Sequence, residues 1–316
     1  IRRPPRSTPK PSSAASDVYK RQSKYSWKDR NLYYQVKSLD PGLYIVSIPI
    51  GRARDITLNA LDVLSSADVI LAEDTRVIKK LLNIYEISVS KVRILAYHDH
   101  NAKKQVPKIM NLLKEGRSIA LVCDAGTPLI SDPGYLLVNE ATNIDVLVTA
   151  SPGPSALLTA LTVSGLPTDR FTFCGFLPSQ KLSRLKYFNK CDLYSTTLIF
   201  FEAPSRILST LEDLIPILGE KRKIVVCREL TKKFETIYRG TALQVKESLQ
   251  SDILKGELVL LISPRIEELV GMNEIDMSLK KLMKSHSLKE SVKIVSENLG
   301  VNKNIVYKSA LKINGN

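Results

Sequence analysis

From Gly42 onward, short apolar runs rich in β-branched residues alternate with longer amphipathic stretches. Such an alternation leaves few folds open, because strands that alternate with helices pair as a parallel sheet whose faces the helices cover. Turns containing glycine, proline or polar residues separate the runs. We therefore predict an α/β fold whose first sheet has strands at residues 43–48, 69–72, 92–96, 119–123 and 145–148.

The stretches between these strands have helical periodicity. In the first of them, Ile56, Leu61 and Leu64 recur at the spacing of one helix face, which we expect to pack on the sheet. Gly116 follows the third stretch, at a position where glycine commonly ends a helix. Helices are predicted near residues 56–65, 76–84, 102–115, 134–141 and 154–163.

The turn sequence Gly165-Leu166-Pro167-Thr168 marks a change of pattern, and we place a domain boundary at about residue 167. Beyond it, two consecutive strands are joined by residues 229–234 with no helix between them. Strands joined in this way run antiparallel, so the second sheet is expected to be mixed. Its strands are predicted at residues 171–176, 196–201, 223–227, 235–238 and 258–262, with helices near 181–189, 205–214 and 242–249.

A polar linker, residues 264–276, leads to a third unit. Ser287 and Glu290 have the spacing of a capping box, in which each side chain bonds to the backbone N–H of the other residue. Gly300 is expected to end the helix that follows, and Asn302 to begin a last helix, which gives a helix–turn–helix outline. The expected division is a tail at 1–40, an N-terminal α/β domain at 41–167, a second α/β domain at 168–265 and a helical unit at 277–316.

Positive charge is concentrated at the start of the chain. Residues 1–37 hold ten of the 46 lysines and arginines but only two of the 32 acidic residues, so more than half of the net charge of +14 is local to them. Charge alone therefore does not predict nucleic-acid binding. The segment is rich in Pro, Ser and Arg, and we expect a translated cloning adapter; a transit peptide is the alternative, which its prolines disfavour.

No apolar run reaches the roughly 18 to 20 residues that span a bilayer. The four cysteines, Cys123, Cys174, Cys191 and Cys227, show neither paired spacing nor the spacing of metal ligands. We therefore expect a cytoplasmic protein without a membrane anchor and without structural zinc.

Each expected strand of the first sheet is followed by a loop that contains polar residues. Open α/β sheets bind ligands at the carboxyl ends of their strands, so loops of this kind at five strand ends favour a ligand site. Any one of them could be only a turn. The loops hold Pro49-Ile50-Gly51, Glu73-Asp74-Thr75-Arg76, Tyr97-His98-Asp99-His100, Asp124-Ala125-Gly126-Thr127 and Ser151-Pro152-Gly153-Pro154-Ser155-Ala156.

The sequence contains no G-x-G-x-x-G dinucleotide fingerprint, no G-x-x-x-x-G-K-[ST] phosphate loop and no G-x-S-x-G nucleophile elbow. NAD, ATP and esterase functions therefore lose their main support. His98 and His100 lie on one side of an extended segment, but no Cys, Asp or Glu stands at a convincing ligand spacing from them. We expect no metal site.

Eight segments occur in a recognisable order: LYIVSIPIGRARDITLNAL, ILAEDTR, YHDHN, CDAGTPLISDPG, SPGPSALLTALTVSGLP, FCGFLP, FEAPSR and KGELVLLI. Together they closely resemble the tetrapyrrole (corrin/porphyrin) methylase superfamily, in its bacterial branch that 2′-O-methylates a cytidine of small-subunit ribosomal RNA. The resemblance covers residues 42–264 and, more loosely, the helical end to residue 313. The Gly-x-Gly-x-Gly-Asp element of the small-molecule enzymes is absent after the first strand, which favours the RNA branch.

The resemblance implies a two-domain methyltransferase that binds S-adenosyl-L-methionine between its domains, usually as a homodimer. It also implies 16S rRNA in the small ribosomal subunit as the partner, with the modified cytidine in the decoding region. Backbone N–H groups at a helix start suit the cofactor carboxylate, and glycines let the main chain approach closely or take positive φ. The matching cofactor-binding residues are Pro49, Gly51, Asp124, Ala125, Gly126, Ser155, Ala156, Ala203 and Gly256.

The expected reaction is in-line transfer of the sulfonium methyl group to a ribose 2′-oxygen, assisted by a base. Glu73, Asp74 and His98 are the candidates, because all three follow strand ends. Asp74 could instead pair with Arg76 or cap the next helix. Residues expected to contact RNA are Arg76, which could equally form a surface ion pair, and Lys289, Lys293 and Lys308, which could equally be solvated surface lysines.

The chain departs from the family pattern at three places. Arg52-Ala53 stand where the family usually has Asn-Leu, Asn59 stands at a position that is often basic, and Ser205 at one that is often His. These differences affect RNA contact more than the class of reaction. Two alternatives stay open: a methylase of a small tetrapyrrole precursor, and a non-catalytic RNA-binding module on the same fold.

Overall fold

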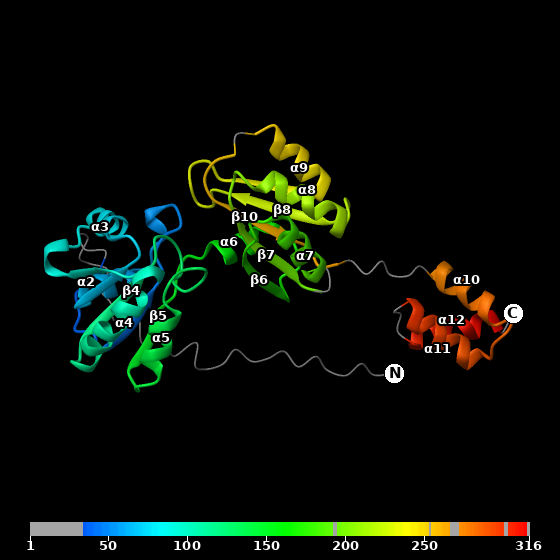
Figure 1. Cartoon of the computed structure of the whole chain (residues 1–316), viewed down its shortest axis with the longest axis horizontal. Coiled ribbons are helices and arrows are strands. Elements are labelled where there is room, and N and C mark those ends of the chain that lie inside the picture. Colours follow the sequence, from blue (N-terminus) through cyan, green and yellow to red (C-terminus); the bar gives the residue numbers. More distant parts are fainter. Residues whose placement is uncertain (1–33, 192–194, 253, 266–271, 300–302, 315–316) are drawn as a thin grey trace, which may run out of the picture. The chain divides into compact units, whose positions relative to one another are not determined.

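The computed structural model of the chain describes residues 34–191, 195–252, 254–265, 272–299 and 303–314. These residues divide into two compact units, and the division falls between Ser155 and Ala156 (Figure 1). The domain limits expected from the sequence stay a prediction. Each unit is described by itself.

Five strands form the sheet of the first unit, and every neighbouring pair runs parallel, as predicted. The order β3-β2-β4-β1-β5 places β4 between β2 and β1, although β3 separates it from β2 in the sequence. The strands are β1 (Gly42–Val46), β2 (Val69–Ala72), β3 (Arg93–Ala96), β4 (Ser118–Val122) and β5 (Leu147–Ser151).

Helices cover both faces of this sheet, because successive side chains of a strand point to opposite faces. Leu71 and Leu121 pack with the apolar side chains of α4 and α5, whereas Ile70 and Val122 pack with those of α2 and α3. The helices are α2 (Leu58–Ser66), α3 (Thr75–Ile84), α4 (Asp99–Lys114) and α5 (Tyr135–Thr142), with short 3₁₀ turns η1 (Ala53–Asp55) and η2 (Val89–Lys91).

Gly116 ends α4 in the way that the sequence predicted. Its φ is +78°, a conformation that glycine adopts without steric cost. The N–H of Gly116 bonds to the carbonyl of Leu113 at 3.0 Å, and the N–H of Arg117 bonds to the carbonyl of Leu112 at 3.1 Å. These two bonds satisfy carbonyls at the helix end.

The fifth strand lies later than predicted. It was expected at residues 145–148, but β5 begins at Leu147 and ends at Ser151. Asp145 has a φ of +55°, which is incompatible with a strand. β5 is an edge strand that pairs only with β1, and Thr149 and Ala150 are exposed, so no apolar run marks its second half.

Residues 34–37 were assigned to the tail but are bonded to the first unit. The N–H of Gln35 donates to Asp62 at 2.6 Å, and the N–H of Lys37 donates to Ser66 at 2.9 Å. Tyr34 packs against the apolar cluster between the sheet and α2 and α3. The expected tail at residues 1–33 lies outside the described residues.

The second unit contains a mixed sheet in the order β6-β7-β10-β8-β9, which confirms the prediction. β6 and β7 are parallel, and the other three pairs are antiparallel. Helices α7, α8 and α9 share one apolar cluster with the sheet, while α6 contacts β10 and β8. The elements are α6 (Ala156–Ser164), β6 (Phe171–Phe176), α7 (Lys181–Cys191), β7 (Thr197–Glu202), α8 (Ile207–Leu218), β8 (Lys223–Arg228), β9 (Thr236–Thr241), α9 (Ala242–Gln250) and β10 (Leu258–Ile262).

Three further helices, α10 (Met272–Leu282), α11 (Leu288–Leu299) and α12 (Lys303–Asn314), pack together around their own small apolar core (Figure 1). The predicted capping box is confirmed: the N–H of Glu290 bonds to Ser287 Oγ at 3.3 Å, and the N–H of Ser287 to the Glu290 carboxylate at 3.1 Å. The predicted Gly300 break and Asn302 cap lie outside the described residues.

The predicted linker was too long at its carboxyl end. Residues 272–276 belong to α10, although they were assigned to the linker 264–276. Ile275 and Leu279, four residues apart, are both buried and bring this segment onto α11 and α12. Within residues 272–276, Ile275 is the only described side chain that is buried, and this single core residue was too weak a signal to predict the helix. No helix in the described ranges is long and apolar enough to cross a membrane.

Candidate active site

The carboxyl ends of β1 and β4 lie at a topological switch point of the first sheet. The two strands are neighbours, but the helices that follow them, α2 and α5, pack on opposite faces. The connections therefore leave the sheet in opposite directions at these strand ends, which is where open α/β sheets bind ligands.

The loops after β1 and β4 are bonded to each other at this point. Ile48 and Gly126 form an isolated antiparallel bridge, with N–H to carbonyl bonds of 2.9 Å and 3.0 Å in the two directions. Gly126 has a φ of +82°, as its glycine predicted, and an added Cβ would lie 3.3 Å from a methyl group of Ile50. The bridge thus requires glycine at position 126.

The loop after β5 joins the same assembly. Thr127 Oγ1 donates to the carbonyl of Pro154 at 3.0 Å and lies 3.0 Å from Ser47 Oγ. An added Cβ at Gly153 would lie 3.0 Å from the Cβ of Ser47, so the two loops approach as closely as glycine allows. We call residues 47–51, 123–127 and 151–155 the switch-point loops.

Most of the predicted cofactor-binding residues lie on the switch-point loops. Backbone and side-chain hydrogen bonds thus bring together residues that are about 80 positions apart in the chain. Ala156 begins α6 and falls in the second unit. The residues on the loops are Pro49, Gly51, Asp124, Ala125, Gly126 and Ser155.

The carboxylate of Asp74 caps α3 and also forms an ion pair at the start of this helix. It accepts the N–H of Arg76 at 2.8 Å as the helix cap, and it holds the Arg76 guanidinium through Nε at 3.0 Å and Nη2 at 2.5 Å. These contacts lower the pKa of Asp74 to about 2. Both alternatives raised for Asp74 from the sequence therefore occur together, and its carboxylate is a weak base. Arg76 forms the ion pair that was the alternative to phosphate contact.

Glu73 has the opposite environment. Its half-buried side chain loses solvation, and the nearby carboxylates of Asp124, Asp132 and Asp99 add negative charge, so the pKa of Glu73 is raised above 4.5. The loop that carries Glu73 is tied to the switch-point loops, because the N–H of Asp74 donates to the Asp124 carboxylate at 3.0 Å. Of the two adjacent acids, Glu73 is the stronger base.

Burial also raises the pKa of Asp132, and the negative charges of Asp124 and Asp99 add to this increase. Asp132 and Asp99 were not among the predicted site residues. The nearness of Asp132 to Glu73 depends on the strand order, which the sequence does not show.

His98 precedes α4, which begins three residues earlier than predicted. The backbone N–H of His98 bonds to Asn101 Oδ1 at 3.0 Å, and its ring Nε2 lies 3.2 Å from Asn101 Nδ2. Nδ1 is buried without a hydrogen-bond partner in the described part of the chain. His100 is exposed, with its ring 6.0 Å from that of His98. Within the described ranges, no group of three or more His, Cys, Asp and Glu is placed to hold a metal ion.

In the second unit, the backbone N–H of Ala203 is bonded to the side chain of the preceding residue, Glu202. The buried carboxylate of Glu202 accepts the N–H of Ala203 at 2.9 Å and the hydroxyl of Thr210 at 2.8 Å, and it forms an ion pair with Arg206 at 3.2 Å. The N–H of Ala203 is therefore already used in a hydrogen bond within its own loop. The role of Glu202 in shaping this loop was not predicted, because only the strand order of the unit shows that the residue is buried.

Gly256 faces a carboxylate of its own chain. It has a φ of +90°, and an added Cβ would lie 2.1 Å from Oε1 of Glu229. The same oxygen accepts the N–H of Glu257 at 3.0 Å and the ammonium of Lys232 at 2.9 Å. Glycine is thus required at position 256 to admit Glu229, and its role in cofactor binding stays a prediction.

The three lysines predicted to contact RNA lie on the helical unit. Lys289 and Lys293 are exposed on α11, and Lys308 is exposed on α12. Their role, like that of the other predicted site residues, stays a prediction.

Comparisons with known proteins agree with this fold. The sequence model of the tetrapyrrole (corrin/porphyrin) methylases matches residues 42–246. A ribosomal RNA small subunit methyltransferase I from Mesorhizobium japonicum is 41% identical over 278 residues, which are 88% of this chain and 94% of that protein. A protein of the same name from Escherichia coli O157:H7 is 41% identical over 276 residues, 86% of this chain and 96% of the relative.

Among solved structures, the methyltransferase CobJ is similar in fold. It superposes with a TM-score of 0.52 over 71% of this chain and 94% of its own, at 16% sequence identity. The family match and the two relatives each cover more than half of the chain. The chain therefore belongs to the tetrapyrrole (corrin/porphyrin) methylase family, among the relatives named ribosomal RNA small subunit methyltransferase I.

Proposed function

We propose that this protein transfers a methyl group from S-adenosyl-L-methionine to the 2′-hydroxyl of a cytidine ribose in 16S ribosomal RNA, in the decoding region of the small subunit. The names of the relatives support methylation of small-subunit ribosomal RNA. The observation on which the proposal rests is the meeting of three loops at the ends of β1 and β4, where they are bonded together beside a desolvated glutamate.

The switch-point loops suit the cofactor. The backbone N–H groups of Gly51, Ala125 and Ser155 donate no hydrogen bond within the described part of the chain. Free N–H groups can donate hydrogen bonds to a carboxylate or to the nitrogen atoms of a base without a change in the loops. We propose that Pro49, Gly51, Asp124, Ala125, Gly126, Ser155 and Ala156 bind S-adenosyl-L-methionine; for Ala203 and Gly256 this role stays a prediction.

When bound, S-adenosyl-L-methionine supplies an electrophilic methyl group on sulfur. The protein then has to hold the ribose oxygen in line with that methyl group, an effect that lowers barriers by up to about 7–11 kcal/mol. A carboxylate oxygen of Glu73 accepts the proton that the 2′-hydroxyl loses. Glu73 is preferred to Asp74 because a base with a higher pKa takes up a proton more readily, and Arg76 already neutralises Asp74.

Labelled S-adenosyl-L-methionine tests the proposal directly. The purified protein is incubated with small ribosomal subunits from cells that lack the modification, with free 16S rRNA, and with a tetrapyrrole precursor. The expected product is labelled RNA in which one ribose becomes resistant to alkaline cleavage at a cytidine. Label in the tetrapyrrole alone, or no label in any substrate while the cofactor binds, would refute the proposal. The homodimer and the cytoplasmic location stay predictions.

A further inference from the structure

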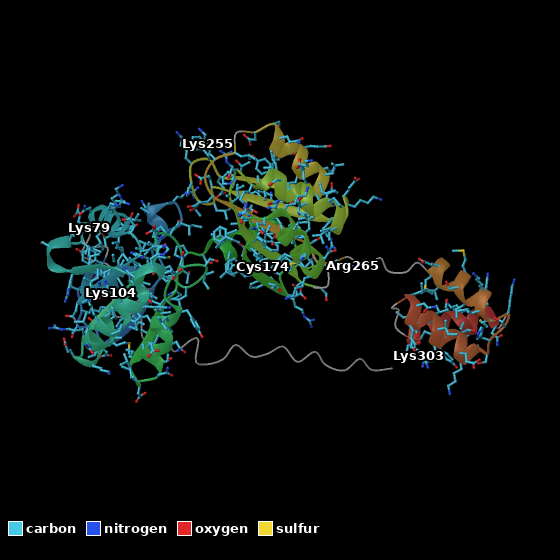
Figure 2. The ribbon with its side chains drawn as sticks, viewed as in Figure 1. Lys79, Lys104, Cys174, Lys255, Arg265 and Lys303 are labelled. Carbon is cyan, nitrogen blue, oxygen red and sulfur yellow. The ribbon has the colours of Figure 1, made fainter. Side chains whose placement is uncertain are left out.

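Most of the net positive charge of the three-helix unit lies on α12. This helix carries Lys303, Lys308 and Lys312 and no acidic residue. By contrast, α10 and α11 each contain two lysines and two acidic residues, so their charges cancel. Figure 2 shows Lys303, the first residue of α12, with its side chain at the surface of the unit.

The outer face of α12 also exposes apolar side chains. Val306, Ser309 and Ala310 are buried against the other two helices, so the opposite face is exposed. On that face Tyr307 is 47% exposed and Leu311 is 48% exposed. The two residues are four apart and therefore adjacent along the helix surface.

A basic ridge runs beside this apolar ridge. Lys308 and Lys312 each follow one residue after Tyr307 and Leu311, so the two pairs lie side by side on the exposed face. Solvation of a helix surface does not explain an exposed aromatic ring, that of Tyr307, beside lysines. Proteins that bind single-stranded nucleic acid combine these two features, because bases stack on aromatic rings while cations neutralise the phosphates.

We propose that this α12 face, formed by Tyr307, Leu311, Lys308 and Lys312, binds single-stranded RNA. A base stacks on the ring of Tyr307, and neighbouring phosphates lie next to Lys308 and Lys312. The inference rests on the proposed function and assigns RNA binding to a unit separate from the switch-point loops.

The test uses the full chain and a fluorescein-labelled single-stranded 20-nucleotide RNA of mixed sequence. Fluorescence anisotropy gives the affinity at several salt concentrations. Tyr307→Ala is expected to lower affinity about 5- to 150-fold, in line with the loss of one stacked base, whereas Tyr307→Phe keeps it. Lys308→Ala with Lys312→Ala is expected to reduce the slope of log affinity against log salt by about 1.4, because two phosphate contacts are lost.

The matched control is Lys280→Ala with Lys281→Ala, which removes the same charge from exposed positions of α10. An equal loss of affinity and slope in this control would overturn the proposal, since net charge rather than the α12 face would then explain binding. Unchanged binding by Tyr307→Ala and by the α12 double variant would also overturn it. The proposal would also be overturned if the α12 variants bound assembled small subunits more weakly but bound the RNA as before, because that result indicates a protein partner.

Methyl transfer by the unaltered protein is measured in the same preparation. If it labels ribosomal RNA while the α12 variants bind RNA normally, the docking inference fails and the proposed function stands. If it labels no RNA, the proposed function fails. Circular dichroism of each variant shows whether the helices are intact; the substituted side chains are exposed, so no loss of fold is expected.

Discussion

Two adjacent acidic residues follow β2, and their surroundings separate their chemistry. Arg76 and a backbone N–H lower the pKa of Asp74 to about 2, whereas burial and three other carboxylates raise the pKa of Glu73. The sequence offered both as candidates for the base without a way to choose. The choice follows from the charges that the fold brings to each of them.

Replacing Glu73 by Gln is expected to lower the rate of methyl transfer about 10²–10⁴-fold, the usual contribution of a general base. Binding of S-adenosyl-L-methionine should be retained. In the unaltered protein the rate should fall as the pH decreases through a value above 4.5, because protonated Glu73 cannot accept a proton. Single-turnover rates between pH 5 and pH 9 check both expectations. Asp74→Asn is the control, and an equal loss of activity in it would contradict the assignment.

The same substitution is expected to stabilise the protein at neutral pH. Because the pKa of Glu73 is higher in the folded protein than in the unfolded chain, the folded state binds more protons between the two values, and stability falls as pH rises through that window. Urea unfolding at pH 7.5 should show a higher midpoint for Glu73→Gln than for the unaltered protein. A lower midpoint would show that Glu73 has a favourable partner in the fold.

Gly256 and Gly219 form a matched pair for a test of backbone strain. Both have positive φ, but an added Cβ at Gly219 meets nothing within 4 Å, whereas at Gly256 it meets the carboxylate of Glu229. Gly219, with φ +87° and ψ 147°, has a backbone conformation that is essentially limited to glycine, so Gly219→Ala should cost about 1–3 kcal/mol of unfolding free energy for the backbone alone. Gly256→Ala should cost about 1–3 kcal/mol more, because Glu229 must leave its charged hydrogen bonds. Equal losses in urea unfolding would contradict the contact with Glu229.

Helices α7 and α8 are joined by a buried ion pair. Arg184 Nε donates to the carboxylate of Asp213 at 2.8 Å, and both side chains are almost fully buried. Arg184 Nη1 also donates to the carbonyls of Pro178 and Ser179, at 3.3 Å and 3.2 Å. The pair therefore holds the loop after β6 as well as the two helices.

Removing one partner of the Arg184–Asp213 ion pair should lower the unfolding free energy more than removing both. Arg184→Met leaves the Asp213 carboxylate buried with only Lys181 nearby, at 3.6 Å, and should cost about 3–5 kcal/mol of unfolding free energy. The double variant Arg184→Met with Asp213→Leu should be more stable than the single variant, although the two loop carbonyls still lose a donor. Urea unfolding of the double-mutant cycle measures this, and a double variant less stable than the single one would contradict it.

At the scale of elements, the helices and central strands were predictable because their signal is local. Buried strands such as β2 and β10 have continuous apolar sequences, and the periodicity of the first predicted helix showed its buried face. The failures have a common cause. β5 is half exposed at a sheet edge, and the start of α10 presents one buried residue, Ile275, so neither has a local apolar pattern.

For the whole molecule, the expected cofactor should stabilise the fold. A ligand that binds the folded protein and not the unfolded chain adds about 2.7 kcal/mol to the unfolding free energy at 100 times its Kd. S-adenosyl-L-methionine should therefore raise the melting temperature in a concentration-dependent way, and methionine at the same concentration should not. Calorimetric titration supplies the Kd. An unchanged melting temperature at saturating cofactor would contradict the assigned site.

The sequence by itself determined the alternating α/β order, the mixed second sheet and the polar loops at the strand ends, because periodicity and turn residues act over a few positions. It also contained the order of motifs that the family shares. The tertiary structure alone decided which of those loops meet. Placing β4 beside β1 joins Ile48 to Gly126, and the same strand order surrounds Glu73 with Asp124, Asp132 and Asp99. These contacts link residues far apart in the chain, so they depend on strand pairing, which no local pattern encodes.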